Sequence, residues 1–408
     1  MKNIFFFLPL LIPSLLITGP FLPDFFLVLT CLYFLLDKNF INFTKIYLKN
    51  REILIYLSLL LLAVVSSLFS DHVISSLKSS LFHIRFILFA LIFFYLSNRN
   101  QKFVEYQLTF LLATLCLLNL DAFLQLFTGK NILGFELKEA YILRPTSFFA
   151  DDLKLGSYLA KFSLFLLALS FYIKKFIKSS LIIVLFSWVL IYFSGERTSF
   201  ILFSLSAISL SLIFSKFINK KDLKILIVSV VIALSLLSYK TIKEPKYFNK
   251  MLINPLKELS IIGEGQLLPA HRKHYEITLE IFKENILIGA GPNTFRYECK
   301  KIIEQNKNIE TGCSTHPHNL YLQLLSETGI FGFLIAIYFY LRLFLIFINN
   351  ILNIKNREFK SNIIINTLLL MTFFPLAPTG NIFNNWYSIT VLFSLGFFLH
   401  LRNKIRNV

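Results

Sequence analysis

The chain has 408 residues, of which 56% are hydrophobic and 47 are Phe, and its mean hydropathy is +0.66. A soluble domain of this length could not bury so much apolar surface, so the composition excludes a soluble enzyme and indicates a membrane protein. The formal net charge is +18. Its positive residues lie mostly in short loops between apolar stretches, so we expect membrane lipids and no nucleic acid as partners.

Apolar stretches recur along nearly the whole chain, and most approach the ~20 residues that a helix needs to cross a bilayer core. Backbone without hydrogen bonds is excluded from that core, so we predict an all-α, polytopic integral membrane protein with about twelve transmembrane helices. The predicted spans are residues 4–19, 21–36, 53–69, 81–97, 103–127, 155–173, 181–194, 199–214, 225–239, 330–348, 362–376 and 386–400.

These spans divide the chain into three predicted parts. Residues 1–239 carry transmembrane helices 1 to 9, residues 240–329 form one large periplasmic loop with amphipathic helices, and residues 330–408 carry helices 10 to 12 and a short cytoplasmic tail. The first apolar stretch has no small-x-small cleavage site behind it, so we expect it to be retained as a span.

The distribution of Lys and Arg orients the predicted bundle. Together with Lys2, the loops expected on one side carry 20 of these residues, whereas the short loops on the other side carry 6. By the positive-inside rule, both termini lie in the cytoplasm and the loop at 240–329 lies outside.

Within that loop, Tyr275, Leu279, Phe282 and Ile286 recur at helical spacing, which predicts an amphipathic helix lying on the bundle. The glycine-rich segment 289–292 then follows as a turn; it does not have the strand and helix that a phosphate-binding glycine loop requires.

Two of the four cysteines, Cys299 and Cys313, lie in this loop. A periplasmic location would allow a disulfide between them, and two free thiols are the alternative. Cys31 and Cys116 lie within predicted spans, where we expect them to serve packing.

A histidine segment follows the loop. Pro317 suits the first position of a helix, which would make His316 the N-cap and place His318 in the first turn. The helix dipole there disfavours imidazolium, so a neutral His318 could act as a general base; the alternative is that the histidines only form local hydrogen bonds. Gly329 is expected to end this helix, and Gly332 to let the next span approach closely.

The same region gives little support for a metal. His316 and His318 are two residues apart, which is a poor spacing for ligands on a helix, and no third ligand lies near. Asp151 and Asp152 are an acidic pair in another outer loop, but no second pair accompanies them in the early loops. We therefore expect no metal and no cofactor.

Several cations fall at the predicted outer ends of spans, where charge is costly unless it serves a function. They are Arg85, Arg144, Lys161 and Arg197, and Arg272 in the large loop lies on the same side. The planar fork of arginine matches phosphate oxygens, so such a group predicts an anionic ligand at the outer surface. The alternative is that each cation pairs with a local carboxylate or with lipid headgroups.

These residues resemble a known family. His318 and Asn319, followed after nine residues by Gly329-x-x-Gly332, are similar to the histidine motif of the O-antigen ligase and polymerase superfamily. Three further segments are similar to its weaker conserved blocks, residues 144–149, 194–197 and 288–295.

The resemblance implies a function. It implies an O-antigen ligase of the bacterial inner membrane, with its active site facing the periplasm, that moves a glycan from undecaprenyl diphosphate to the lipid A core in a metal-independent, inverting reaction. An O-antigen polymerase or a protein O-oligosaccharyltransferase would differ only in the acceptor. A flippase or transporter of lipid-linked glycans is the non-enzymatic alternative.

The resemblance also implies roles for particular residues. His318 is expected to be the catalytic base, and Arg85, Arg197 and Arg272 to bind the diphosphate. The expected supporting residues are Arg144, Lys161, His316, Asn319, Gly329 and Gly332. Glu196 precedes Arg197 where many family members have a small polar residue.

Overall fold

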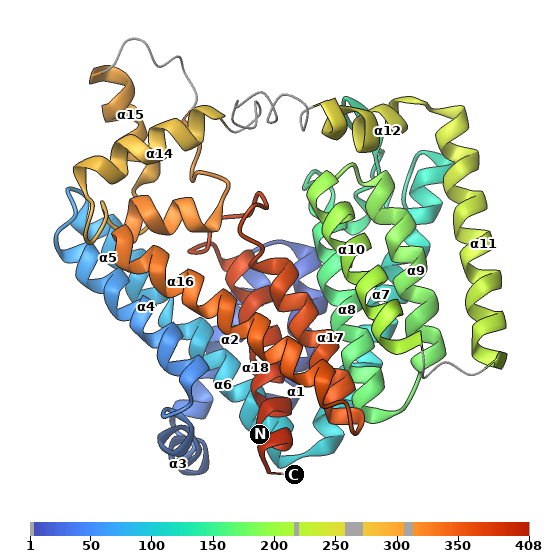
Figure 1. The fold of residues 1–408 in the computed structure, drawn as a ribbon, viewed down its shortest axis with the longest axis horizontal. Helices are drawn as coiled ribbons and strands as arrows, with labels where there is room; N and C mark the ends of the chain where they lie inside the picture. The colour runs from blue at the N-terminus through green and yellow to red at the C-terminus, as the bar shows by residue number, and fades with distance from the viewer. Residues whose placement is uncertain (1–3, 216–219, 258–271, 306–312, 408) are drawn as a thin grey trace.

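The computed structural model describes residues 4–215, 220–257, 272–305 and 313–407, and these form a bundle of helices (Figure 1). The helices before the first long loop are α1 (Ile4–Leu15), η1 (Leu16–Thr18), α2 (Phe21–Leu35), α3 (Lys38–Tyr47), α4 (Arg51–Leu68), α5 (Val73–Phe82), α6 (Ile84–Arg99) and α7 (Gln101–Thr128). An antiparallel hairpin follows, formed by β1 (Lys138–Ala140) and β2 (Ile142–Arg144).

The remaining elements are again helical. They are η2 (Ser147–Phe149), α8 (Leu155–Ile173), α9 (Ile177–Phe193), α10 (Arg197–Phe214), α11 (Lys220–Lys243), α12 (Lys246–Phe248), η4 (Asn249–Ile253), α14 (Arg272–Glu284), α15 (Phe295–Gln305), α16 (Leu320–Leu352), α17 (Arg357–Thr372) and α18 (Asn385–Arg406).

Each predicted span falls on one of these helices, so the prediction of an α-helical, polytopic membrane protein is confirmed. Among the described residues, six helical segments are long and apolar enough to cross a membrane: Arg51–Leu68, Val73–Arg99, Gln101–Thr128, Leu155–Ile173, Arg197–Phe214 and Leu320–Leu352. Three shorter apolar helices are Phe5–Thr18, Phe21–Leu35 and Ile177–Phe193. The number twelve stays a prediction.

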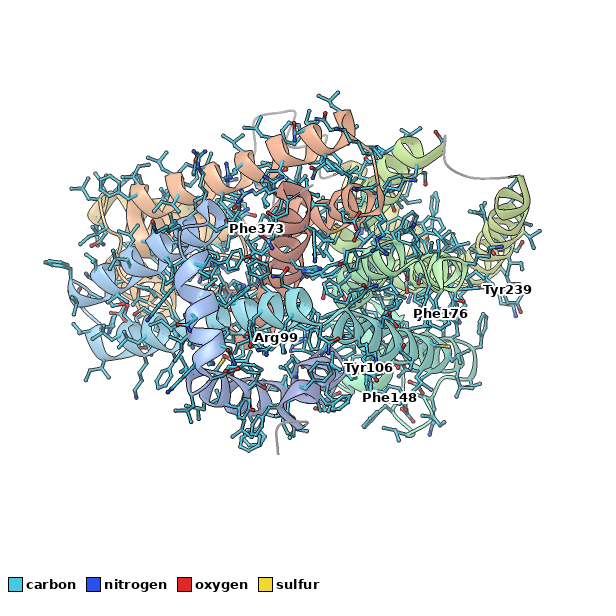
Figure 2. The ribbon with its side chains drawn as sticks, turned by 90° about the horizontal axis from the view of Figure 1, so that it is seen from below. Arg99, Tyr106, Phe148, Phe176, Tyr239 and Phe373 are labelled. Carbon is cyan, nitrogen blue, oxygen red and sulfur yellow. A yellow bond between two sulfur atoms is a disulfide. The ribbon has the colours of Figure 1, made fainter. Side chains whose placement is uncertain are left out.

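The centre of the bundle is formed by α6, α8, α17 and α18. Gly396 on α18 allows a close approach to α6, because a Cβ on it would lie 2.6 Å from the carbonyl oxygen of Ala90. Phe89, Phe93 and Phe165 are fully buried around this contact. Side chains fill the space between the helices throughout the bundle (Figure 2), as close packing requires.

Helices α12, α14 and α15 lie at the end of the bundle opposite the two termini (Figure 1). The predicted amphipathic helix is α14, but part of its predicted packing face is wrong, because Leu279 and Ile286 are exposed. Since α14 packs against both α15 and α16, its buried side chains are Tyr275, Ile277, Thr278 and Ile281.

The structure joins Cys299, on α15, to Cys313 in a disulfide with a Cα–Cα distance of 5.7 Å. Cys299 is buried beside Ile277, Ile281 and Phe295. The disulfide therefore ties α15 to the chain that leads into the histidine segment.

As predicted, Gly329 ends the helical segment that begins at Leu320, because its φ of 66° and ψ of −166° are not helical. A second helical segment of α16 continues beyond this kink to Leu352. The prediction for Gly332 is wrong, because the atom nearest to a Cβ built on it is Oγ1 of Thr328 in α16 itself, at 1.8 Å, and not an atom of a neighbouring span. The space beside Gly332 is filled by that side chain.

Candidate functional site

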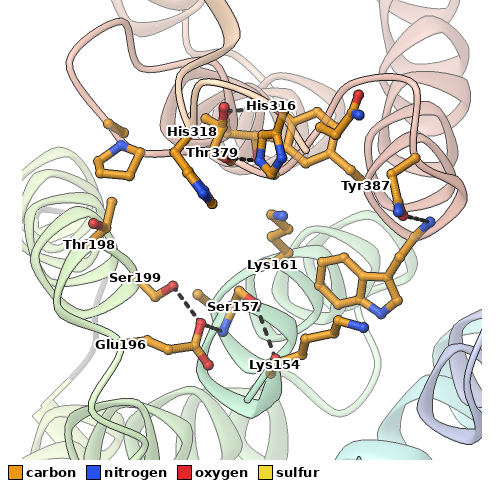
Figure 3. A pocket seen from close by; sticks show the side chains of 18 of the residues that line it. Lys154, Ser157, Lys161, Glu196, Thr198, Ser199, His316, His318, Thr379 and Tyr387 are labelled. Atoms are coloured by element: carbon orange, nitrogen blue, oxygen red, sulfur yellow. Dashed lines mark hydrogen bonds between the residues drawn. The ribbon is translucent and has the colours of Figure 1, made fainter. Parts of the chain in front are cut away.

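A cavity of about 840 Å³ lies beside the histidine segment (Figure 3). It is bordered by α8, α10, the start of α15, the histidine segment and the chain between α17 and α18. Its charged and imidazole side chains, all within the described residues, are Lys154, Lys161, Glu196, Arg197, Arg296, His316 and His318. Four Lys and Arg thus face one carboxylate, which makes the cavity suited to an anion.

His316 and His318 lie on one side of the cavity, with ring centroids 4.3 Å apart (Figure 3). Nε2 of His316 lies 3.2 Å from the carbonyl oxygen of Thr379, and its Nδ1 lies 3.0 Å from the hydroxyl of Thr315. The backbone N–H of Thr379 donates to the carbonyl of His318 at 2.8 Å. The segment around Thr379 therefore holds both histidines in place.

The predicted helix start at Pro317 is wrong. Helix α16 begins at Leu320, and Asn319 is its N-cap, with Oδ1 accepting from the backbone N–H groups of Tyr321 and Leu322 at 3.0 Å each. His318 has φ 58°, a left-handed conformation that a helical turn excludes. His318 therefore lies immediately outside the helix.

Asn319 also holds the opposite segment. Its side-chain N–H groups donate to the carbonyls of Pro375 at 2.8 Å and Ala377 at 3.3 Å. One side chain thus caps α16 and ties the histidine segment to the chain after α17.

Glu196 and Lys161 lie across the cavity from the histidines (Figure 3). The carboxylate of Glu196 accepts hydrogen bonds from the backbone N–H groups of Gly156 at 2.7 Å and Ser157 at 2.9 Å. It therefore caps the N-terminus of α8 from the turn between α9 and α10. Burial raises the pKa of Glu196, although Arg144 and these hydrogen bonds act in the opposite direction.

Lys161 extends from α8 toward the centre of the cavity (Figure 3). Its ammonium lies 5.1 Å from the ring centroids of both Trp386 and Tyr387. A cation–π contact of this kind orients the flexible side chain of Lys161, and the ammonium keeps its positive charge.

Arg144 does not line the cavity but supports the turn that does. It is buried, and its Nε donates to the carbonyl of Ser194, two residues before Glu196. Its desolvation lowers its pKa, which Glu196 partly offsets. Lys250 lies nearby, and burial together with the charges of Arg144 and Arg197 lowers its pKa to about 8.

The structure does not bring two of the predicted arginines to the cavity. Arg85 forms an ion pair with Asp24 at 2.7 Å and donates to Asn385 at 2.9 Å. Arg272 is half exposed and forms an ion pair with Glu276, one turn along α14, at 2.7 Å. Their binding of a diphosphate stays a prediction.

The acidic pair weighed as a metal site is also engaged. Asp151 forms an ion pair with Lys138, and Asp152 forms one with Lys154, both at 2.6 Å.

Sequence reasoning missed three residues near the histidines. Arg296 and Lys154 line the cavity, and the ring of His274 on α14 lies 5.4 Å from that of His318. Arg296 had a usable signal, because it directly follows the block at 288–295. His274 had none, since only the packing of α14 brings it near.

Residues 182–337 match the family model described as O-Antigen ligase. This segment belongs to the O-antigen ligase superfamily. It runs from α9 into α16, so it contains Glu196, Arg197, Arg296 and both histidines but not Lys161. The resemblance found in the histidine motif is confirmed, and the match supports a role in O-antigen biosynthesis. No curated protein matches the chain.

Proposed function

We propose that the chain is an O-antigen ligase, which transfers O-antigen glycan from undecaprenyl diphosphate to the lipid A core at the periplasmic face of the bacterial inner membrane. The observation that carries the proposal is that one cavity contains both the histidine pair and the cations Lys161, Arg197 and Arg296. A general base and an anion-binding group are the two requirements for displacing a diphosphate with a hydroxyl.

The contacts of His316 suit a positioning role. A carbonyl oxygen only accepts, so the contact to Thr379 requires the hydrogen of His316 on Nε2. Nδ1 then accepts from the hydroxyl of Thr315. Both nitrogens of His316 are thus engaged, which suits a positioning residue, and the family resemblance supports His318 as the base.

In the proposed reaction, His318 takes the proton of the acceptor hydroxyl while the hydroxyl oxygen attacks the anomeric carbon of the donor sugar. The bond between that carbon and the diphosphate oxygen breaks, and the electron pair leaves with the diphosphate. Attack from the face opposite the leaving group inverts the configuration. Arg197 and Lys161 stabilise the charge that develops on the diphosphate, an effect worth about 3 to 4 kcal/mol for one such donor.

Reconstitution tests the proposal. Purified protein in vesicles, given undecaprenyl-diphosphate-linked O-antigen and lipid A core, should form capped lipid A core in the presence or absence of a chelator. His318→Ala should lower the rate by about 10²- to 10⁴-fold, the usual contribution of a general base. His72→Ala is the matched control, because His72 contacts Glu298 and Tyr297 and does not line the cavity.

The outcomes separate the alternatives. Full activity of His318→Ala would rule out the base, and inhibition by a chelator would rule out the metal-independent reaction. In a deletion strain, long polymer on undecaprenyl diphosphate beside bare core indicates a ligase, whereas cores capped with a single repeat indicate a polymerase. Glycan that crosses vesicles without forming product indicates a transporter.

A further inference from the structure

Arg296, the second residue of α15, reaches the cavity from the segment between α11 and α16. The cavity lining within the described residues contains no other cation from that segment. Arg272 was the expected one, but its side chain is 52% exposed and bound to Glu276. Arg296, and not Arg272, therefore lines the cavity from this segment.

Asn293 holds Arg296 in position. The Nη2 of Arg296 donates to Oδ1 of Asn293 at 2.8 Å, and Nδ2 of Asn381 donates to the same oxygen at 3.1 Å. Nδ2 of Asn293 in turn donates to the hydroxyl of Ser79 on α5 at 3.2 Å. Asn293 has φ 64°, a conformation that asparagine tolerates better than most residues. The turn at Asn293, the chain at Asn381 and helix α5 therefore together orient the guanidinium of Arg296.

Arg296 keeps a hydrogen-bond donor for a ligand, although its charge also acts on the nearby buried carboxyl of Glu327. Its Nε is buried and has no hydrogen-bond partner in the described part of the chain. No carboxylate among those residues lies within ion-pair distance of it, and the oxygens of Glu327 accept instead from Gln323 and from the backbone N–H of Phe295. A buried donor without a partner is costly, so the arrangement suits a ligand that supplies an acceptor.

We propose that Arg296 binds the diphosphate of the donor in this cavity and that Asn293 is its positioning residue. The ligand class is a pyrophosphate-type anion, whose adjacent oxygens match the guanidinium fork. The identification of that anion with the glycan donor rests on the proposed function.

Binding of inorganic pyrophosphate to the purified full-length protein, measured by isothermal titration calorimetry in detergent, tests Arg296 directly. Arg296→Gln should weaken binding by about tenfold or more, since it removes a charge-assisted contact. Arg296→Lys should recover part of the loss. Lys300→Gln is the matched control, because Lys300 is exposed one turn further along the same helix.

Asn293→Asp provides an independent variant that changes charge and almost nothing else. Aspartate keeps the shape, can accept from Asn381 and from the hydroxyl of Ser79, and neutralises the guanidinium that it holds. We expect it to weaken pyrophosphate binding as much as Arg296→Gln, and its thermal unfolding to resemble that of the unsubstituted protein. If Arg296→Gln fails to fold, pyrophosphate binding by Asn293→Asp and Arg296→Lys tests the proposal instead.

Unchanged pyrophosphate affinity in these variants would overturn the proposal, and so would the lack of measurable binding by the unsubstituted protein. Equal affinity for inorganic phosphate would point to a single phosphate group, such as a phospholipid headgroup, and would overturn the diphosphate assignment. Failure of glycan transfer with pyrophosphate binding that still depends on Arg296 would refute the proposed function alone. Transfer that does not depend on Arg296 would refute this inference alone.

Discussion

Gly289 and Gly329 meet backbone to backbone beneath the histidine segment. A Cβ on Gly289 would lie 2.3 Å from the backbone nitrogen of Thr328, and one on Gly329 would lie 2.3 Å from the carbonyl oxygen of Leu287. Both glycines have positive φ, 73° and 66°. The turn after α14 can therefore approach α16 only because neither position carries a side chain.

Three backbone hydrogen bonds of 2.9 to 3.0 Å fasten this contact: Ala290 to Ser326, Gly291 to Glu327 and Ile330 to Ile286. They use carbonyl and amide groups that the kink at Gly329 frees from the helix ladder. The turn that leads to Arg296 is thereby fixed to the helix that His318 and Asn319 precede.

We expect Gly329→Ala to destabilise the protein by about 1 to 3 kcal/mol or more, since it combines a strained φ with a clash against backbone. Transfer activity should fall with it. Thermal unfolding in detergent measures the effect. Gly380→Ala is the control, because the nearest atom to its new Cβ would be 3.6 Å away. An unchanged midpoint for Gly329→Ala would contradict the close approach.

Asn319 offers a test that separates the helix cap from the tether. Asn319→Asp keeps an oxygen that caps Tyr321 and Leu322 but cannot donate to the carbonyls of Pro375 and Ala377. We expect near-normal stability and a reduced kcat with little change in donor KM, because His318 loses its position. Asn319→Ala should also lose about 1 kcal/mol of cap stability. Full activity of Asn319→Asp would show that the tether is dispensable.

The helices could be predicted because apolar run length in the sequence directly reflects what a bilayer requires. The cavity could be predicted only in part. His318 and Arg197 were found because local motifs carry them, and both line the cavity. The predicted start of α16 is wrong because the side chains of His316 and Asn319 could each cap the helix. Asn319 is favoured by its hydrogen bonds to the carbonyls of Pro375 and Ala377, which are distant in the sequence.

The predicted roles of the arginines depended on partners that spacing does not reveal. Arg85 is engaged by Asp24, 61 residues earlier, and by Asn385, 300 residues later. Arg296 reaches the cavity through a turn whose path is set by contacts with α16. Ion pairing across such separations is a property of the packed bundle, so residue type and predicted side of the membrane were insufficient.

Glu196 makes the site sensitive to pH. Burial raises its pKa, so the folded protein binds a proton there more readily than the unfolded chain. Its negative charge therefore costs stability above the unfolded pKa of about 4.5, and the cost is complete once pH has risen through the folded pKa. We expect Glu196→Gln, which cannot titrate, to gain thermal stability relative to the unsubstituted protein as the pH rises above the unfolded pKa. A difference in melting temperature that stays constant with pH would contradict this assignment.

The disulfide between Cys299 and Cys313 constrains α15, the helix that carries Arg296. A disulfide that closes a loop of about 15 residues contributes roughly 3 kcal/mol in the chain-entropy model. The sequence separation here is 14. Reduction should therefore make α15 more susceptible to limited proteolysis and weaken pyrophosphate binding several-fold. Cys299→Ala combined with Cys313→Ala should do the same without reductant.

Cys116→Ser is the control, since Cys116 is an exposed free thiol on α7 and should change neither measurement. Mass spectrometry of the unreduced, purified protein decides whether the bond exists. Two free thiols at Cys299 and Cys313 would remove the constraint on α15, and the position of Arg296 would then have to depend on Asn293 and the Gly289 turn alone.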